Sequence, residues 1–151
     1  FVLGLANGVS ENIIYNLGLN DRDCVIKNNS LMAFEVSDVA IVASGTATLE
    51  CALAKTPCVV IYKTSFLSWF FASRFIKINF ISIINILANK MIVAELLQKN
   101  CNVRLVCQSI NQVLISDNKQ YEESLDGVLS SLGCGDSYFK TATYIVGSLS
   151  C

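Results

Sequence analysis

Short apolar runs alternate with segments whose apolar residues recur at helical spacing, from the first residue to about position 62. Continuous apolar runs predict strands over 1–6, 24–27, 39–43 and 58–62. Helical periodicity predicts helices between them, over 10–17, 30–36 and 46–54. Strands that are apolar throughout are typical of a parallel sheet buried on both faces. The alternation therefore predicts an α/β fold with a parallel sheet and helices on both faces.

The pattern beyond residue 62 is mainly helical. It predicts helices over 65–76, 93–98, 109–115, 119–132 and 136–149, with a short extended piece at 80–83. The last three helices would close the domain. Because no internal repeat, charge run or proline-rich linker interrupts the sequence, residues 1–151 are expected to form one domain.

Composition excludes several classes of protein. The 151 residues are 53% hydrophobic and 15% charged, which excludes a disordered chain. A net charge of -1 provides no field for nucleic acid, so no nucleic-acid partner is expected. The sequence contains no histidine, which excludes a Ser-His-Asp triad, a Cys-His pair and a histidine zinc site within the chain.

Seven cysteines without a Cys-x-x-Cys pair favour reduced thiols that fill the core of a cytosolic protein. The longest runs without charge, 78–89 and 105–116, have 12 residues each, fewer than the roughly 18 that a membrane span needs. Residues 66–77 combine Trp69 and several phenylalanines with Arg74 and Lys77, a mixture typical of a membrane surface. Aromatic residues packed in the core are the alternative for this segment.

One segment, residues 43–50, combines a strand end, a small-residue loop and a helix start. Gly45 would let a ligand approach the backbone, Ser44 or Thr46 could cap the helix, and the first-turn amides favour phosphate. Glu50, about one turn into the helix, suits hydrogen bonds from sugar hydroxyls, as acidic residues do for ribose in dinucleotide sites. An ordinary capped helix with a solvent-facing Glu50 is the alternative.

Residues 37–101 resemble the lipid A disaccharide synthase family, glycosyltransferases that join UDP-2,3-diacylglucosamine to lipid X and release UDP. The matching segments keep the family's order and spacing, at 37–40, 43–50, 56–57, 62–63, 76–77, 81–85, 87–88 and 95–98. The Ser-Gly-Thr to Glu motif at 44–50 is shared by many GT-B glycosyltransferases, whereas the block at 62–98 is more specific to this family.

The resemblance implies a Rossmann-like fold, the carboxyl-terminal lobe of a GT-B enzyme that binds the UDP-sugar. It implies that Ser44, Gly45 and Thr46 lie against the diphosphate and that Glu50 takes the ribose hydroxyls. It also implies that Asn85 contacts the nucleotide and that Glu95 and Gln98 face the cleft. Phosphate binding at Lys90 would be weaker than at the Arg that the family has there. Lys90 stands where the family has Arg, so it keeps the charge but loses the bidentate fork.

The chain departs from the family inside the loop that should hold the nucleotide. Ile84 and Ala94 replace prolines, Asn89 replaces Gly, and Met91 replaces Glu. Because Pro and Gly constrain or free the backbone, these changes put the loop path in question. The catalytic base is expected in the acceptor lobe, which has no counterpart in these residues.

The resemblance further implies inverting glycosyl transfer without a cofactor or metal, by a cytoplasmic protein on the inner face of the inner membrane. Its partners would be UDP-2,3-diacylglucosamine, lipid X, the membrane surface and a second copy of the chain. Another GT-B UDP-sugar transferase or epimerase, and a truncated non-catalytic nucleotide-binding remnant, are the alternatives. At the residue level, Asn85 could be a turn residue, and Glu95 with Gln98 the polar face of a helix.

Overall fold

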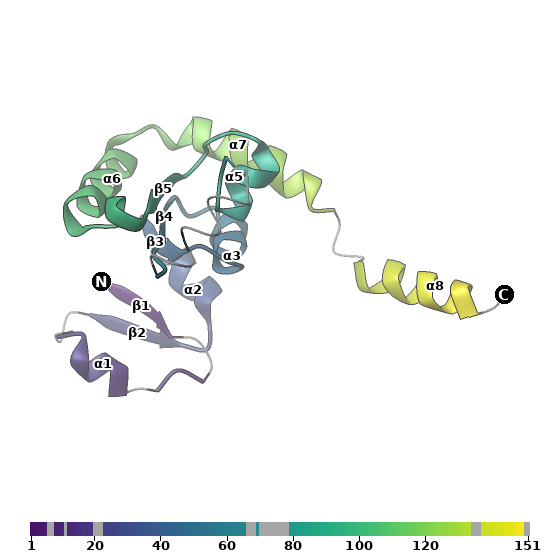
Figure 1. The fold of residues 1–151 in the computed structure, drawn as a ribbon, viewed down its shortest axis with the longest axis horizontal. Helices are drawn as coiled ribbons and strands as arrows, with labels where there is room; N and C mark the ends of the chain where they lie inside the picture. The colour runs from purple at the N-terminus through teal and green to yellow at the C-terminus, as the bar shows by residue number, and fades with distance from the viewer. Residues whose placement is uncertain are drawn as a thin grey trace.

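The computed structural model in Figure 1 describes residues 1–5, 8–10, 12–19, 23–65, 69, 79–133 and 137–149. A two-stranded sheet pairs β1 (Val2–Leu5) with β2 (Cys24–Lys27). A three-stranded sheet has the order β3 (Ala40–Ala43), β4 (Cys58–Tyr62), β5 (Ala94–Leu97). The three strand pairings between described residues are all parallel. The predicted α/β class with parallel strands is therefore confirmed, and it is consistent with a Rossmann-like lobe.

Helices cover both faces of the three-stranded sheet (Figure 1), with α6 on one side and α3, α5 and α7 on the other. The helices are α1 (Asn12–Asn16), α2 (Ser30–Glu35), α3 (Ala47–Leu53), α5 (Ile83–Ala88), α6 (Val103–Ile115), α7 (Asn118–Ser131) and α8 (Ser137–Leu149), with a 3₁₀ turn η1 (Gln98–Asn100). The helices predicted from periodicity at 10–17, 30–36, 46–54, 109–115, 119–132 and 136–149 are confirmed as elements, with shifted ends.

The core lies between β4 and the helices α3, α5 and α7. Val60 of β4, Ile84 of α5 and Leu125 of α7 have no exposed surface and belong to one apolar cluster. Burial of each such side chain contributes about 1.5–3 kcal/mol. On α7, Leu125 and Val128 are three residues apart and share the buried face, so this helix closes the domain as predicted.

Helix α2 connects the two sheets. A Cβ added to Gly4 of β1 would lie 3.4 Å from the Cβ of Ala33, which shows how closely α2 covers the first sheet. On its other side, the Phe34 carbonyl accepts a hydrogen bond from the Thr56 hydroxyl at 2.8 Å, next to the start of β4. Helix α2 thus holds the two sheets together, although their described strands do not pair with each other.

Two predictions for the second half of the chain are wrong. Residues 93–98, predicted as a helix, contain β5, because pairing along β4, with Val59 opposite Ala94, outweighs a short helical pattern. The extended piece predicted at 80–83 gives way at Ile83 to α5, which begins there because Ser82 caps it by accepting a hydrogen bond from the Asn85 amide.

The last predicted helix forms but does not close the domain. In Figure 1, α8 extends away from the rest of the molecule. Its Tyr138, Phe139 and Tyr144 side chains are 91%, 75% and 79% exposed. The helix predicted over 65–76 lies outside the described residues apart from its first residue and Trp69.

Candidate functional site

The candidate site lies at the carboxyl edge of the three-stranded sheet. Because β3, β4 and β5 are parallel, the residues that follow them meet at one edge, where open α/β sheets bind ligands. Ser44 follows β3, Lys63 follows β4 and Gln98 follows β5.

Three consecutive backbone amides at this edge have no partner among the residues that the structure describes. The amides of Thr48 and Leu49 donate to the carbonyls of Gly45 and Thr46 at 3.1 and 2.9 Å. The amides of Gly45, Thr46 and Ala47 make no hydrogen bond to the described residues. A Cβ added to Gly45 would meet nothing within 4 Å. Among the described residues, the loop therefore presents backbone donors without a partner, as an anion site requires.

The predicted cap of α3 is wrong. Thr46 occupies the cap position without a side-chain hydrogen bond, and the Ser44 hydroxyl donates instead to the Ile81 carbonyl at 3.1 Å. The Thr48 hydroxyl donates to the Gly45 carbonyl at 2.6 Å and so holds the loop. The Thr46 hydroxyl is left exposed beside the free amides.

Glu50 lies in the first turn of α3 and is partly buried. Its Oε2 accepts a hydrogen bond from the hydroxyl of Ser30, the first residue of α2. Its Oε1 makes no hydrogen bond to the described residues, so the carboxylate keeps acceptor positions for a ligand. Ser30 was not among the site residues predicted from the sequence, because twenty residues separate it from Glu50.

Glu95 and Asn85 form a hydrogen-bonded network with the segment 81–82, called here the Glu95 network. The Glu95 carboxylate accepts from the Ile81 amide at 2.8 Å, the Ser82 amide at 3.0 Å and Asn85 Nδ2 at 2.7 Å. Because Ser44 donates to Ile81, the network reaches the candidate site. Glu95 thus fixes the segment that supports Ser44.

Asn85 has no exposed surface, and the chain itself fills its hydrogen-bonding positions. Its Nδ2 donates to the Val93 carbonyl at 2.9 Å as well as to Glu95. Its Oδ1 accepts from the amides of Ile92 and Val93 at 2.7 and 3.0 Å. An amide side chain offers two donor hydrogens and two main acceptor positions, and all four are occupied. In this structure Asn85 supports the loop backbone from within.

Lys90 and Gln98 occupy different surroundings. Lys90 Nζ donates to the Ser124 hydroxyl of α7 at 3.1 Å, and no hydrogen bond between described residues joins it to the 44–46 loop. Gln98 lies at the carboxyl edge of the sheet, and its Nε2 is buried without a partner among the described residues. A buried donor without a partner costs stability, so Gln98 is a candidate to donate to a ligand.

The cysteines are only partly core residues. Cys51 and Cys58 are buried, as predicted, whereas Cys24 and Cys107 are exposed, contrary to the prediction. A hydrogen bond with Cys51, followed by burial, raises the pKa of the Cys58 thiol above its ordinary value. Burial likewise raises the pKa of Tyr121, whose hydroxyl donates to the Thr56 carbonyl at 3.0 Å. These groups therefore stay protonated at neutral pH and act as packing residues.

A cavity of about 390 Å³ lies at the opposite, amino edge of the three-stranded sheet. Asp38, just before β3, and Pro57, just before β4, line it together with Lys55 and the end of α6. The ammonium of Lys55 is bound to Asp126 at 2.8 Å, which raises the Lys55 pKa. This cavity is separate from the free amides at 45–47.

Comparison with known proteins identifies the family. The sequence model of lipid-A-disaccharide synthetase matches residues 9–132. The chain belongs to the lipid-A-disaccharide synthetase family. It is 36% identical over 136 residues to the lipid-A-disaccharide synthase of Rickettsia conorii, which covers 87% of this chain and 30% of the relative. It is 41% identical over 134 residues to lipid-A-disaccharide synthase 1 of Legionella pneumophila strain Lens, covering 87% and 34%.

The same enzyme in the Paris strain of Legionella pneumophila is 49% identical over 104 residues, covering 68% of this chain and 27% of the relative. This member of the lipid-A-disaccharide synthetase family therefore spans about a third of the length of the curated relatives it matches. In the part of the chain that the structure describes, no helix is long and apolar enough to cross a membrane. Of the predicted membrane-surface segment, 66–77, only Trp69 lies within that part.

Proposed function

We propose that this chain supplies the UDP-sugar-binding half of a lipid A disaccharide synthase. The enzyme would transfer 2,3-diacylglucosamine from its UDP donor to lipid X, giving lipid A disaccharide phosphate and UDP. The observation that carries the proposal is the run of amides at Gly45, Thr46 and Ala47, which have no partner among the described residues and lie beside Glu50, in a member of this family. The amides suit a diphosphate, and the carboxylate suits the ribose hydroxyls.

The proposed roles divide between contact and support. The 45–47 amides and the Thr46 hydroxyl would donate to the diphosphate, and Gln98 Nε2 would donate to the donor substrate from the end of β5. Ser44, Asn85 and Glu95 would act as positioning residues, because their side chains are bound to the chain itself. Lys90 would reach phosphate only after leaving Ser124.

The reaction would proceed with inversion at the anomeric carbon of the donor. As the glycosidic bond to UDP breaks, negative charge develops on the diphosphate, and amides aimed at it stabilise this charge without reorganisation. A base outside residues 1–151 would remove the proton of the acceptor hydroxyl. Residues 1–151 would form one nucleotide-binding lobe of a cytoplasmic, peripheral enzyme on the inner face of the inner membrane, with a homodimer as its assembly.

The experiment is a comparison of UDP and inorganic pyrophosphate binding by calorimetry. Glu50→Ala should weaken UDP at least tenfold, because a hydrogen bond to a charged acceptor contributes about 1.5–3 kcal/mol. Pyrophosphate affinity should change by less than about twofold, because the proposed partner of Glu50 is ribose. Glu123→Ala, which removes an exposed carboxylate of α7, is the charge-matched control. Equal UDP affinity in Glu50→Ala and the parent chain would remove Glu50 from the site.

A further inference from the structure

The Glu50 carboxylate is bound to Ser30, a residue of another helix. The Ser30 hydroxyl donates to Glu50 Oε2 and so joins α2 to α3. No other hydrogen bond or ion pair between the described residues includes this carboxylate. The side chains one helical turn away carry no charge that could hold it, and they belong to Thr46, Ala47, Leu53 and Ala54. Within the described part of the chain, the orientation of the carboxylate therefore depends on Ser30.

The turn after β2 holds Ser30 in place. Asn28 has a φ of 58°, in the left-handed region that asparagine tolerates. Asn29 caps α2, because its side chain accepts a hydrogen bond from a first-turn amide at 3.0 Å. At the other end of α2, the Phe34 carbonyl accepts from the Thr56 hydroxyl at 2.8 Å. Helix α2 is thus fixed at both ends, and Ser30 presents its hydroxyl from a rigid position beside α3, against which α2 packs.

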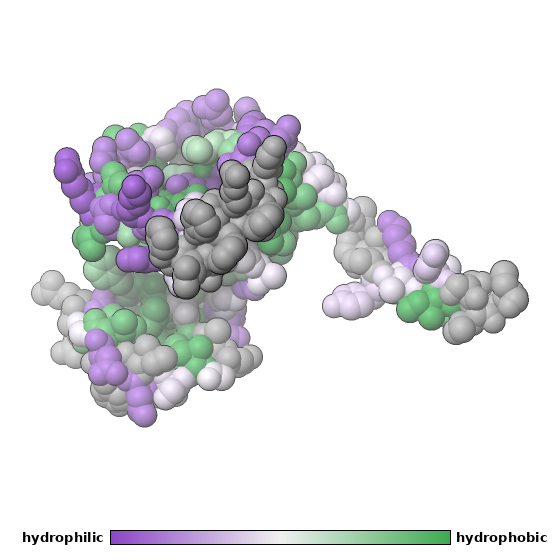
Figure 2. Space-filling model, in the orientation of Figure 1, coloured by the Kyte–Doolittle hydropathy of each residue, from purple (hydrophilic) through white to green (hydrophobic). Residues whose placement is uncertain are grey.

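No other side chain of α2 can replace Ser30 in this hydrogen bond. The helix has the sequence Ser-Leu-Met-Ala-Phe-Glu, in which Ser30 carries the only side-chain donor. Leu31 and Met32, which follow it, are 42% and 49% exposed. Figure 2 accordingly shows green, apolar surface where the parts of the molecule that hold the two sheets meet, at the level of α2 in Figure 1. Removal of the Ser30 hydroxyl therefore leaves Glu50 without a substitute donor on this helix.

The hydrogen bond from Ser30 leaves the carboxylate able to accept from a ligand. An ionised carboxylate has two oxygens with about four acceptor positions in total. Ser30 uses one position of Oε2, and Oε1 makes no hydrogen bond to the described residues. About three positions therefore remain, enough for the 2′ and 3′ hydroxyls of a ribose. Ser30 thus orients the carboxylate without competing with such a ligand.

We infer that Ser30 is a positioning residue, which holds the Glu50 carboxylate in the orientation that accepts both hydroxyls of a ribose. The inference rests on the proposed function, and it adds that the unit of β1, β2 and α2 contributes to the selection of the nucleotide. A glutamate side chain that rotates in the unbound protein loses this freedom when it binds a ligand, and the hydrogen bond from Ser30 removes that loss in advance. The gain applies only to ligands with ribose hydroxyls, because the proposed partners of the diphosphate are the 45–47 amides.

Calorimetry on the full chain tests this inference with three ligands, which are UDP, its 2′,3′-dideoxy analogue and inorganic pyrophosphate. Ser30→Ala should weaken UDP roughly two- to tenfold, the cost of ordering one flexible side chain on binding. The affinities for the dideoxy analogue and for pyrophosphate should change by less than about 1.5-fold, because neither ligand offers a ribose hydroxyl to Glu50. Ser30→Thr keeps the hydroxyl and should bind UDP within about 1.5-fold of the parent chain.

Further variants separate positioning from a change in the fold. In a Glu50→Ala background, Ser30→Ala should change UDP affinity by less than about 1.5-fold, because the hydroxyl acts through Glu50. Ser130→Ala removes an exposed serine of α7 and is the matched control, which should bind UDP like the parent. Because Asn29 rather than Ser30 caps α2, the circular dichroism spectrum of Ser30→Ala should match that of the parent.

The outcomes distinguish this inference from the proposed function. Unchanged or tighter UDP binding by Ser30→Ala, together with weaker binding by Glu50→Ala, overturns the inference and leaves the proposed function in place. An equal loss of affinity for all three ligands, or a loss that persists in the Glu50→Ala background, assigns Ser30 a structural role and also overturns it. No UDP binding by the parent chain, or equal UDP affinity in the parent and Glu50→Ala, contradicts the proposed function and this inference together.

Discussion

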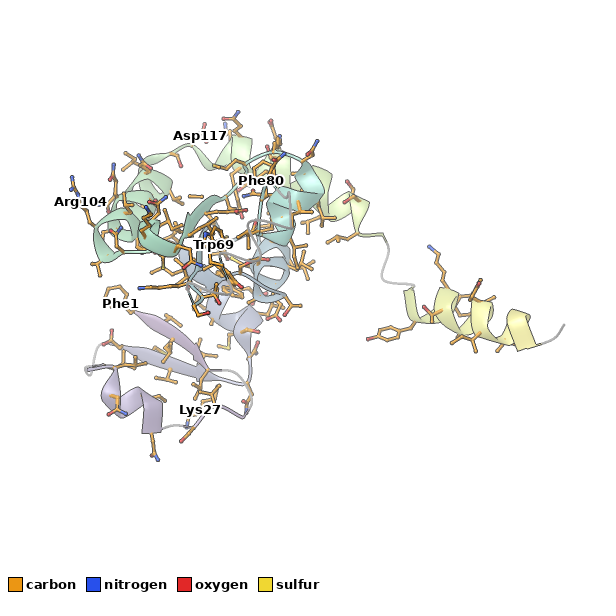
Figure 3. All side chains as sticks on the ribbon, viewed as in Figure 1. Phe1, Lys27, Trp69, Phe80, Arg104 and Asp117 are labelled. Atoms are coloured by element: carbon orange, nitrogen blue, oxygen red, sulfur yellow. The ribbon has the colours of Figure 1, made fainter. Side chains whose placement is uncertain are left out.

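Replacing Asn85 should destabilise the chain far more than replacing an exposed asparagine. Figure 3 shows the side chains as sticks on the ribbon, with α5 and β5 in the main body of the molecule. Asn85 belongs to α5 and has no exposed surface. Asn85→Ala removes four hydrogen bonds, and two of the groups left behind, the amide and carbonyl of Val93, belong to a residue only 2% exposed. Each buried polar group left unpaired costs about 1–3 kcal/mol, so the loss for these two is about 2–6 kcal/mol. This is a large fraction of the roughly 5–15 kcal/mol stability of a domain.

The measurement is urea unfolding followed by circular dichroism at 222 nm, with the free energy of unfolding extrapolated to water. The matched control is Asn102→Ala, because Asn102 is exposed and also makes two hydrogen bonds, to the Leu105 amide and the Lys99 carbonyl. Loss of this helix cap should cost about 1 kcal/mol. A cost for Asn85→Ala no larger than that for Asn102→Ala would refute the assignment of Asn85 to an internal supporting role.

A second substitution at this position separates the donor from the acceptor. Asn85→Asp keeps the oxygen that accepts from Ile92 and Val93 but places a second carboxylate where Asn85 Nδ2 now lies, 2.7 Å from Glu95. Two like charges at about 3 Å repel by roughly 6 kcal/mol at an effective dielectric of about 20, so one of them binds a proton in the folded state. Since the unfolded chain binds that proton only at lower pH, the deficit relative to the parent should shrink as pH falls from 8 to 5. An equal deficit at both pH values would contradict the geometry of the Glu95 network.

Three further predictions concern the core and its thiols. Leu125→Ala should lower the free energy of unfolding in urea by about 2–5 kcal/mol, because Leu125 has no exposed surface. Leu132→Ala, at a residue 43% exposed, should lower it by less than about 1 kcal/mol. Similar losses for the two variants would argue against α7 as part of the core. Iodoacetamide at pH 7.5 should modify the exposed Cys24 in the folded chain but not the buried Cys58, and peptide mass spectrometry measures both. Fast modification of Cys58 would contradict its burial. Because the folded-state pKa values of Cys58 and Tyr121 are raised, the contribution of these groups to stability is complete at neutral pH and falls as pH rises above about 9. Urea unfolding at pH 7.5 and pH 10 measures this change. An undiminished free energy of unfolding at pH 10 would contradict it.

Several strands could be predicted from the sequence because their residues are apolar throughout. The run 58–62 coincides with β4, since a strand in the middle of a parallel sheet is buried whatever its partners are. The run 94–97 could not be assigned in this way, because Glu95 interrupts it and gives a short helical pattern. Only the position of β4 beside it, with Ile61 opposite Leu96, makes it a strand.

The candidate site was predictable where it is local in sequence. The order of strand, Gly45 and Glu50 predicted a loop with exposed amides, and the amides there have no partner within the described part of the chain. The partners of Ser44 and Glu50 were not predictable, because Ile81 and Ser30 lie 37 and 20 residues away. The same holds for the pairing of Asn85 with Glu95, which depends on how α5 packs against β5.

At two positions where this chain differs from the family, the backbone conformation suits the residue that the chain has. Asn89, in place of Gly, ends α5 with φ of 50°, in the left-handed region, and asparagine tolerates this region better than other side chains. Ile84, in place of Pro, is the second residue of α5. Ile has a backbone N–H that Pro lacks, but an amide in the first turn of a helix has no partner within that helix. The substitution therefore changes no hydrogen bond of the helix. The Ile84 side chain is fully buried in the core, which favours the substitution. The segment between Ser82 and Asn89 therefore forms a capped helix with the residues this chain has, and the Glu95 network holds its start against the sheet.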